Sequence, residues 1–169
     1  MADSSPLGHL ILTEAWKRLQ SIRQLQLVAF SYVPPSPSWE GKADVYVDVR
    51  RGYPSTILFT ERGTWRIGQG NEVPFSNVYR WTLAPNKIRL EHLRHGPSQP
   101  VSLIDLVPRH QGAPVGNSKV SPWILAGRCP HYCGSDRYSG TMGLAEHGMK
   151  LDWTIQGQQK AATIHIVYS

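Results

Sequence analysis

Residues 43–71, ADVYVDVRRGYPSTILFTERGTWRIGQGN, contain two runs of alternating side chains that are joined by a turn. In the first run, three valines alternate with polar and aromatic residues, and in the second run Ile57 and Phe59 share one parity. Successive side chains of a β-strand point to opposite faces, so each run predicts a strand with one apolar face. The turn sequences Gly52-Tyr53-Pro54 and Gly68-Gln69-Gly70-Asn71 end these strands. This stretch therefore predicts two antiparallel strands.

The same two-residue period recurs along the chain between turns that are rich in glycine and proline. Prolines at positions 34, 35 and 37 are expected to end the first strand, because proline cannot pair in the interior of a sheet. Before that strand, Leu10, Ala15 and Leu19 recur at helical spacing and predict an amphipathic helix that acts as a lid or plug. The predicted strands are Leu25–Val33, Ala43–Arg50, Thr56–Ile67, Phe75–Thr82, Lys87–Arg94, Val101–Val107, Trp123–Cys129, Arg137–Leu144, Met149–Ile155 and Ala161–Tyr168.

A sheet of about nine or ten short strands must curl or expose its edges, and closure into a barrel removes those edges. The sequence therefore predicts an all-β fold, an antiparallel up-and-down β-barrel of about 8–10 strands, with a β-sandwich as the alternative. Residues 1–24 are expected to form an N-terminal segment that contains the helix, and residues 25–169 a single barrel domain. A barrel of more than about eight strands is wide enough to enclose a small ligand.

The composition is that of a globular protein, with 40% hydrophobic and 18% charged residues. The net charge of +6 is spread along the chain without a nucleic-acid-binding motif, so nucleic acid is not an expected partner. Cys129 and Cys133 are too few for a disulfide framework, and the first residues show no signal pattern, which favours a cytoplasmic protein. No apolar run is long enough to span a bilayer.

Several short blocks of sequence resemble those of a known family. They are Trp39-Glu40-Gly41, Glu61-Arg62-Gly63-Thr64-Trp65, Phe75-Ser76-Asn77-Val78-Tyr79-Arg80-Trp81, Leu90-Glu91-His92-Leu93-Arg94-His95-Gly96, Pro130-His131-x-Cys133-x-x-Asp136-x-Tyr138 and Leu151-x-Trp153-x-Ile155-x-Gly157-x-x-Lys160. Over residues 25–168 the chain is similar to a bacterial family of small lipocalin-like (calycin-type) domains of unknown function. The resemblance implies a calycin-type barrel and implies no activity. Members of that family often carry an arginine two positions before Tyr79, where this chain has Asn77, so no role of that arginine carries over.

The segment Cys129–Gly140 gathers residue types that bind metals, transfer protons or hydrogen-bond a ligand. Cys129, His131 and Cys133 would share one face of a straight strand, but alternate residues lie about 6–7 Å apart, which strains a tetrahedral zinc site. We therefore predict no metal and no cofactor. A turn or bulge at Gly134-Ser135 would bring the polar side chains together; alternatively, they are structural and hydrogen-bond the backbone. The catalytic candidates in this segment are His131, Cys133, Asp136 and Tyr138.

Further polar residues fall on strand faces that are otherwise apolar, as Glu61 does after Ile57 and Phe59. Buried charged groups require partners, so inward-facing residues of this kind predict an internal network of Glu61, His92, Arg94, Asp105, His131 and Asp136. Alternatively, each of them lies near a strand end and reaches solvent. Aromatic residues on the same strands would fill the core or form a stacking wall for a ligand. The predicted ligand-binding residues are Glu61, Trp65, Tyr79, Trp81, His92, Arg94, His131, Tyr138 and Trp153.

Three functions are compatible with such a barrel, because one fold hosts many functions. The first is binding of a small apolar or amphipathic molecule in the interior. The second is an enzyme on the same scaffold, an isomerase, lyase or hydrolase, with His131 and Asp136 in acid-base roles. The third is a ligand-free structural or interaction module. The interior separates them, because an aromatic-lined cavity favours the first two functions and a solid core favours the third.

Overall fold

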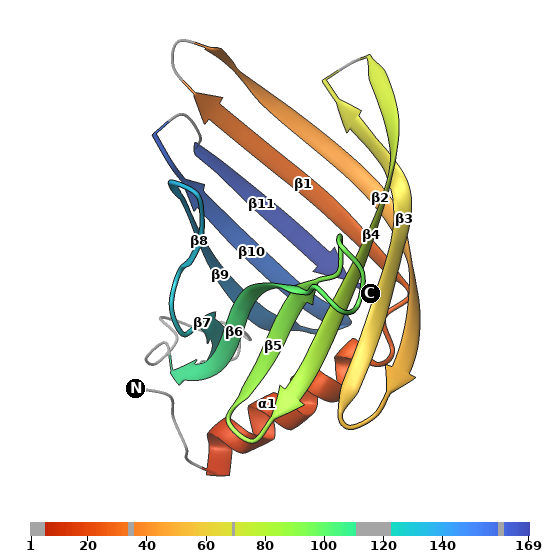
Figure 1. Cartoon of the computed structure of the whole chain (residues 1–169), viewed down its shortest axis with the longest axis vertical. Coiled ribbons are helices and arrows are strands. Elements are labelled where there is room, and N and C mark those ends of the chain that lie inside the picture. The colour runs from red at the N-terminus through yellow and green to blue at the C-terminus, as the bar shows by residue number, and fades with distance from the viewer. Residues whose placement is uncertain (1–5, 34–35, 69, 111–122, 159–160) are drawn as a thin grey trace.

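The computed structural model of the chain describes residues 6–33, 36–68, 70–110, 123–158 and 161–169. Within these residues one helix precedes eleven strands (Figure 1). Both the N-terminal helix and the series of short strands agree with the periodicity of the sequence. The elements are α1 (Pro6–Leu19), β1 (Gln24–Val33), β2 (Ser36–Gly52), β3 (Thr56–Ile67), β4 (Asn71–Ala84), β5 (Lys87–His92), β6 (Val101–His110), β7 (Trp123–Gly127), β8 (His131–Cys133), β9 (Asp136–Ala145), β10 (Gly148–Gln156) and β11 (Ala161–Tyr168).

The strands form a closed antiparallel barrel. The sheet runs in the order β10-β11-β1-β2-β3-β4-β5-β6-β7-β9, and β9 pairs again with β10, so ten of the eleven described strands complete the ring. The short β8 lies outside the ring and forms a hairpin with β9. The predicted barrel is therefore confirmed, and the alternative of a β-sandwich does not hold.

The hairpin of β1 and β2 is longer than the alternation predicts. β1 ends at Val33, as predicted, but β2 begins at Ser36 and contains Pro37, whereas the predicted second strand begins only at Ala43. The register of β2 with β3 begins only at Gly41, so the first residues of β2 pair with β1 alone. Because proline at a strand edge breaks no hydrogen bond of the ladder, it is tolerated there. Residues 34 and 35 lie outside the described part of the chain.

One end of the barrel is closed by α1, which lies across its lower end in Figure 1 and contacts β5, β6, β7 and β10. Leu12, Ala15 and Leu19 are buried against the strands. Arg18, from the last turn of the helix, donates hydrogen bonds to the backbone carbonyls of Ala145 and Gly148 in the β9–β10 hairpin. The helix therefore plugs this end of the barrel, and it is tied to the strands by both apolar and polar contacts.

The apolar core fills the half of the barrel next to this helix. Phe59 packs against Trp81 at a centroid distance of 5.8 Å and against Tyr168 at 6.1 Å. All three side chains are at most 2% exposed and belong to one cluster with α1. Tyr168 also lines the cavity that lies above this cluster, so it separates the packed half of the barrel from the hollow half.

A β-bulge in β6 changes which of its side chains face inward. Leu90 of β5 pairs with Ile104 and Glu91 pairs with Ser102, so Leu103 is an extra residue on β6. Val101 and Leu103 therefore line the cavity, whereas beyond the bulge Ile104 and Leu106 enter the core. The bulge moves the following residue of β6, Asp105, to the outer face.

Candidate functional site

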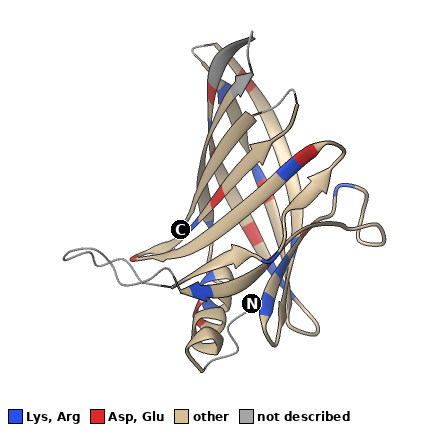
Figure 2. Cartoon of the chain, turned by 90° about the vertical axis from the view of Figure 1, so that its left-hand side faces the viewer, with Lys and Arg blue, Asp and Glu red and all other residues tan. Residues whose placement is uncertain are grey.

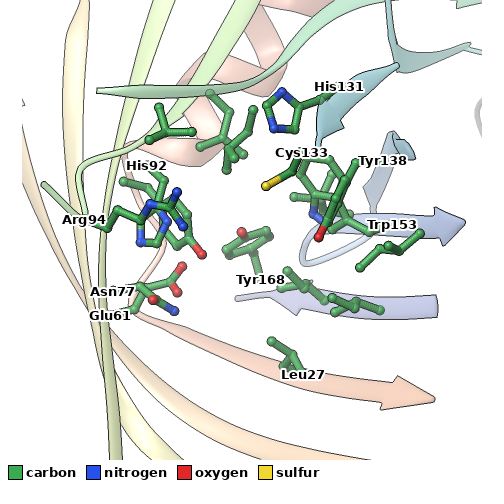
Figure 3. A pocket seen from close by; sticks show the side chains of 18 residues that line it. Leu27, Glu61, Asn77, His92, Arg94, His131, Cys133, Tyr138, Trp153 and Tyr168 are labelled. Atoms are coloured by element: carbon green, nitrogen blue, oxygen red, sulfur yellow. The ribbon is translucent and has the colours of Figure 1, made fainter. Parts of the chain in front are cut away.

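The half of the barrel away from α1 contains a cavity of about 250 Å³ (Figure 3). Eight of its eighteen described lining residues are aliphatic and come from β1, β5, β6, β10 and β11. The aliphatic lining consists of Leu27, Leu90, Val101, Leu103, Leu151, Ile155, Ile164 and Ile166, and the remaining lining residues are Glu61, Asn77, Tyr79, His92, Arg94, His131, Cys133, Tyr138, Trp153 and Tyr168. This is an apolar chamber with a small set of polar groups, the arrangement typical of ligand sites.

Glu61 is the carboxyl group of the cavity wall, and its position follows from the alternation of β3. Ile57 and Phe59 enter the core, and Glu61, two residues further, reaches the cavity and is 4% exposed. Burial raises the pKa of Glu61 from 4.5 to about 7, although a hydrogen bond from Asn77 favours the ionised form and lowers it. Asn77 lies directly opposite on β4. Near neutral pH, this carboxyl group is therefore poised between its protonated and ionised forms.

Two phenols lie near this carboxyl group. Burial raises the pKa of both Tyr79 and Tyr168 above the ordinary value of 10, and the negative charge of Glu61 raises each further. Both hydroxyl groups therefore remain protonated at physiological pH. Tyrosine in this form can donate a hydrogen bond to a ligand or to an ionised carboxylate.

His92 and Arg94 stand on the same side of the cavity as Glu61 (Figure 3). His92 is directly opposite Tyr79 in the sheet and stacks on its ring at a centroid distance of 4.8 Å. Burial, followed by the positive charge of Arg94, lowers the pKa of His92 below 6.5, which favours its neutral form. Arg94 follows the end of β5 in a turn in which the amide of Gly96 donates to the carbonyl of Leu93. Because Arg94 is exposed and still lines the cavity, it marks the mouth.

The β8–β9 hairpin forms the side of the cavity opposite His92 and Arg94 (Figure 3). Gly134, with a positive φ of 63°, and Ser135 form a two-residue turn, which confirms the expected reversal at this point. Because the turn pairs His131 with Tyr138 and Cys133 with Asp136, the four catalytic candidates share one face of the hairpin.

Three of these four candidates reach the cavity, and Asp136 does not. His131, Cys133 and Tyr138 line it, and the rings of His131 and Tyr138 have a centroid distance of 5.8 Å. Asp136 instead packs at the rim against Gly157, where a Cβ atom would lie 2.0 Å from the Oδ1 atom of Asp136. The structure thus does not bring Asp136 together with His131 inside the cavity.

The structure places seven of the nine predicted ligand-binding residues in the cavity wall, namely Glu61, Tyr79, His92, Arg94, His131, Tyr138 and Trp153. Trp65 and Trp81 lie elsewhere. Trp81 is 0% exposed and fills the core near α1, because its position on β4 is two residues closer to the closed end than that of Tyr79. Trp65 packs against the glycine at position 41 in the neighbouring strand β2.

The predicted internal network is incomplete. Asp105 lies outside the cavity, where its carboxylate pairs with Lys87 at 2.6 Å and with Arg89 at 2.8 Å. The reason is the β-bulge at Leu103, which reverses the side-chain alternation that the sequence suggested. Glu61, His92, Arg94 and His131 remain as polar lining residues.

Sequence reasoning did not select Asn77 or Tyr168 as site residues. Asn77 shares the parity of Tyr79 and Trp81 on β4, and this alternation could have identified it. Tyr168 lies at the end of the alternating run of β11 and shares the parity of Ile164 and Ile166. The aliphatic lining could not be separated from core residues by its pattern, because both kinds of residue occupy the same inward face.

Basic and acidic residues are interspersed along the strands of the barrel (Figure 2). Arg80 pairs with Glu91 at 2.7 Å, and Arg66 pairs with Asp44 at 2.9 Å. Among the described residues, no cluster of three or more His, Cys, Asp or Glu side chains has the geometry to hold a metal ion. The described helix is too short to cross a membrane.

The closed antiparallel barrel and its N-terminal helix have a calycin-like fold. The chain belongs to a family of unknown function, DUF6314, whose model matches residues 31–169. This agrees with the predicted resemblance to a family of unknown function with a lipocalin-like barrel.

Comparison with solved structures supports the same fold. The S-type phycobiliprotein lyase CPES from Guillardia theta is similar over 95% of this chain and 97% of that chain, with a TM-score of 0.52. Only 11% of the aligned residues are identical, so the likeness shows a shared fold. No curated protein matches the chain in sequence.

Proposed function

We propose that the protein binds a small, largely apolar molecule inside its barrel. The observation that carries this proposal is the cavity of about 250 Å³ with a mostly aliphatic and aromatic wall. Transfer of apolar surface from water into such a chamber is favourable, at roughly 25 cal/mol per Å² of buried area. A purely structural barrel would gain stability by filling this space with its own side chains.

Glu61 supports the proposal because it provides a polar anchor in the apolar wall. A buried carboxylate is costly unless its oxygen atoms are hydrogen-bonded, and it can accept more bonds than Asn77 donates. A ligand with an N–H or O–H group beside its apolar body would complete the hydrogen bonding of Glu61. We therefore expect a ligand with a donor group at its inner end.

Two adjacent residues of β11 allow a matched test. Ile166 lines the cavity, whereas Val167 points outward and is 40% exposed. The probe is N-phenyl-1-naphthylamine, a neutral apolar amine whose fluorescence rises in apolar surroundings. Ile166→Trp should fill the cavity and weaken saturable binding of this probe at least tenfold, whereas Val167→Trp should leave the Kd within about twofold.

The proposal fails if Ile166→Trp, shown to be folded by far-UV circular dichroism, binds the probe as the wild type does. It also fails if both tryptophan variants weaken binding equally, because the probe would then not report on the cavity. A second cavity substitution, Leu27→Trp, with its outward-facing neighbour Gln26→Trp as the control, guards against misfolding of the first variant.

An enzyme is the second candidate function, and the pKa of Glu61 favours it. A carboxyl group with a pKa of about 7 is suited to both acceptance and donation of a proton at neutral pH. His131 and Cys133 line the same cavity, and the barrel shares its fold with a protein named as a lyase. The acid-base pair predicted from the sequence, His131 and Asp136, is an alternative to Glu61, with Asp136 acting from the rim of the cavity.

Binding and catalysis are separated by the fate of the bound molecule. Mass spectrometry would identify what copurifies with the protein under native conditions, and the same molecule would then be incubated with the purified protein. Conversion that is lost in Glu61→Gln or in His131→Ala supports an enzyme. Recovery of the unchanged molecule supports a binding protein, and unaltered conversion in Asp136→Ala excludes a role of that carboxylate.

We also propose a reducing, cytoplasmic setting. Cys129 and Cys133 are both exposed and both free. Exposed thiols persist in reducing compartments, whereas extracellular proteins favour disulfides. Fractionation of the native cells, with detection by antibody, would test this location.

A further inference from the structure

We infer that the cavity is built for an amphipathic anion, whose charged group lies at Arg94 while its apolar body fills the barrel. This inference rests on the proposed binding function and names the chemical class of the ligand. It follows from the separation of charges along the cavity, and from the surroundings of Arg94.

The two charged groups of the described cavity wall lie at different depths. Arg94 is exposed at the mouth, and it is the one Arg or Lys among the described lining residues. Glu61 is 4% exposed and is the one acidic residue of that lining. The cavity therefore has a positive charge at its mouth and a carboxyl group deeper in its wall.

Arg94 forms no ion pair within the described part of the chain. Two arginines on the outer faces of β4 and β5 behave differently, because Arg80 pairs with Glu91 and Arg89 pairs with Asp105. The guanidinium group of Arg94 is therefore available to bind an anion. Arginine presents its donors in a planar fork that matches the oxygen atoms of carboxylate, sulfonate or phosphate groups.

The two histidines of the cavity can add hydrogen bonds to the same anion. His92 lies on the side of Arg94, and His131 lies across the cavity from it (Figure 3). Because His92 stacks on Tyr79 and is favoured in its neutral form, it contributes a donor while Arg94 contributes the permanent charge. The cavity wall therefore presents an arginine and two imidazole groups to the head group of a ligand.

Glu61 determines the orientation of such a ligand. A negative group placed deep in the cavity would meet the carboxylate of Glu61 in surroundings of low polarity, where like charges repel strongly. The anionic end is therefore excluded from the floor and stays at the mouth, where it is partly solvated. The uncharged end, which carries the donor group for Glu61, enters first, and the apolar body lies against the aliphatic wall formed by residues such as Leu27, Ile164 and Ile166.

Two related probes separate the charge from the apolar body. Anilinonaphthalene-8-sulfonate carries the same anilinonaphthalene body and N–H group as N-phenyl-1-naphthylamine, and it differs by one sulfonate. Arg94→Met should weaken binding of the sulfonate probe about tenfold and leave the Kd of the neutral probe within about twofold. Arg94→Lys should restore part of the loss. The matched control is Arg62→Met, which removes the same charge from an exposed position beside Glu61.

Several results would overturn the inference. One is an unchanged Kd of the sulfonate probe in Arg94→Met, and another is an equal loss in Arg62→Met, which would indicate a general effect of net charge. If Ile166→Trp weakens binding of both probes while Arg94→Met alters neither, the inference fails and the binding function stands. If Ile166→Trp leaves both probes bound, or if neither probe binds the wild type saturably, both proposals fail.

Discussion

Glu61 on β3 and Asn77 on β4 lie directly opposite each other, and the Asn77 side chain hydrogen-bonds the buried Glu61 carboxyl group. Both residues line the cavity. Asn77 provides a neutral amide and no positive charge. Glu61 therefore faces a partner that stabilises its charge only partly, which leaves its pKa sensitive to the surroundings.

Substitution of Glu61 by glutamine should change how stability depends on pH. The pKa of Glu61 is about 7 in the folded protein, against an ordinary value of 4.5. Between these values the folded state binds a proton that the unfolded state releases, so stability falls as the pH rises, by about 3 kcal/mol in total. Glu61→Gln remains neutral and should be more stable than the wild type at pH 8, and the gain should shrink toward pH 4.5.

Urea unfolding at several pH values measures this difference. Glu146→Gln is the matched control, because its side chain is 90% exposed and the substitution removes the same charge. An equal effect of Glu61→Gln at both ends of the pH range would contradict the prediction.

Asn77→Leu should raise the pKa of Glu61 further, because it removes the hydrogen bond that favours the ionised carboxylate. The expected loss of stability is about 1–3 kcal/mol above pH 8, where Glu61 is ionised in an apolar wall, and it should be smaller near pH 5. Titration of the Glu61 carboxyl by carbon-13 NMR in the wild type and in the variant measures the shift directly. A lower pKa in Asn77→Leu would refute this account of the pair.

Trp81→Phe should alter stability by less than about 1 kcal/mol, although Trp81 is completely buried. The indole Nε1 of Trp81 is buried without a hydrogen-bond partner among the described residues, and this unsatisfied donor costs free energy. Phenylalanine removes that donor and loses some packing, so the two effects oppose each other. Phe59→Leu, at a neighbouring buried position with no donor to lose, should cost more in the same unfolding experiment.

Two glycines on opposite sides of the barrel should respond differently to alanine. A Cβ atom at Gly63 would lie 2.6 Å from the carbonyl oxygen of Asp44 on the adjacent strand, so the backbone would have to move. Gly143 has no atom within 4 Å of its added Cβ. Gly63→Ala should destabilise the protein by about 2 kcal/mol or more, whereas Gly143→Ala should be neutral or slightly stabilising. Thermal unfolding of the two variants decides the comparison, and equal melting temperatures would contradict it.

The alternation of apolar residues was sufficient to predict the barrel and the polar side of the cavity around Glu61. On β3 the sequence period matches the observed strand over its whole length, and so Glu61 could be placed on the inner face. The turn at Gly134 was also recognisable, because glycine tolerates the left-handed conformation found there.

Positions beyond a bulge could not be predicted in this way. The extra residue Leu103 leaves no signature in the sequence of β6, and it moves Asp105 from the expected inner face to the outer face. A two-residue period also does not show how far along the barrel axis a residue lies. Trp81 and Tyr79 share a parity, yet one fills the core and the other lines the cavity. Such differences depend on the tilt of the strands and on the helix that fills one end.

The attachment of α1 to the β9–β10 hairpin closes one end of the barrel. Arg18 holds the helix to two backbone carbonyls, and the core above the helix ends at Tyr168. A ligand of the proposed kind would enter and leave the barrel at the end opposite α1, past Arg94 and the β8–β9 hairpin. In the proposed binding function, the distance from Tyr168 to that rim would limit the length of the ligand that the barrel accepts.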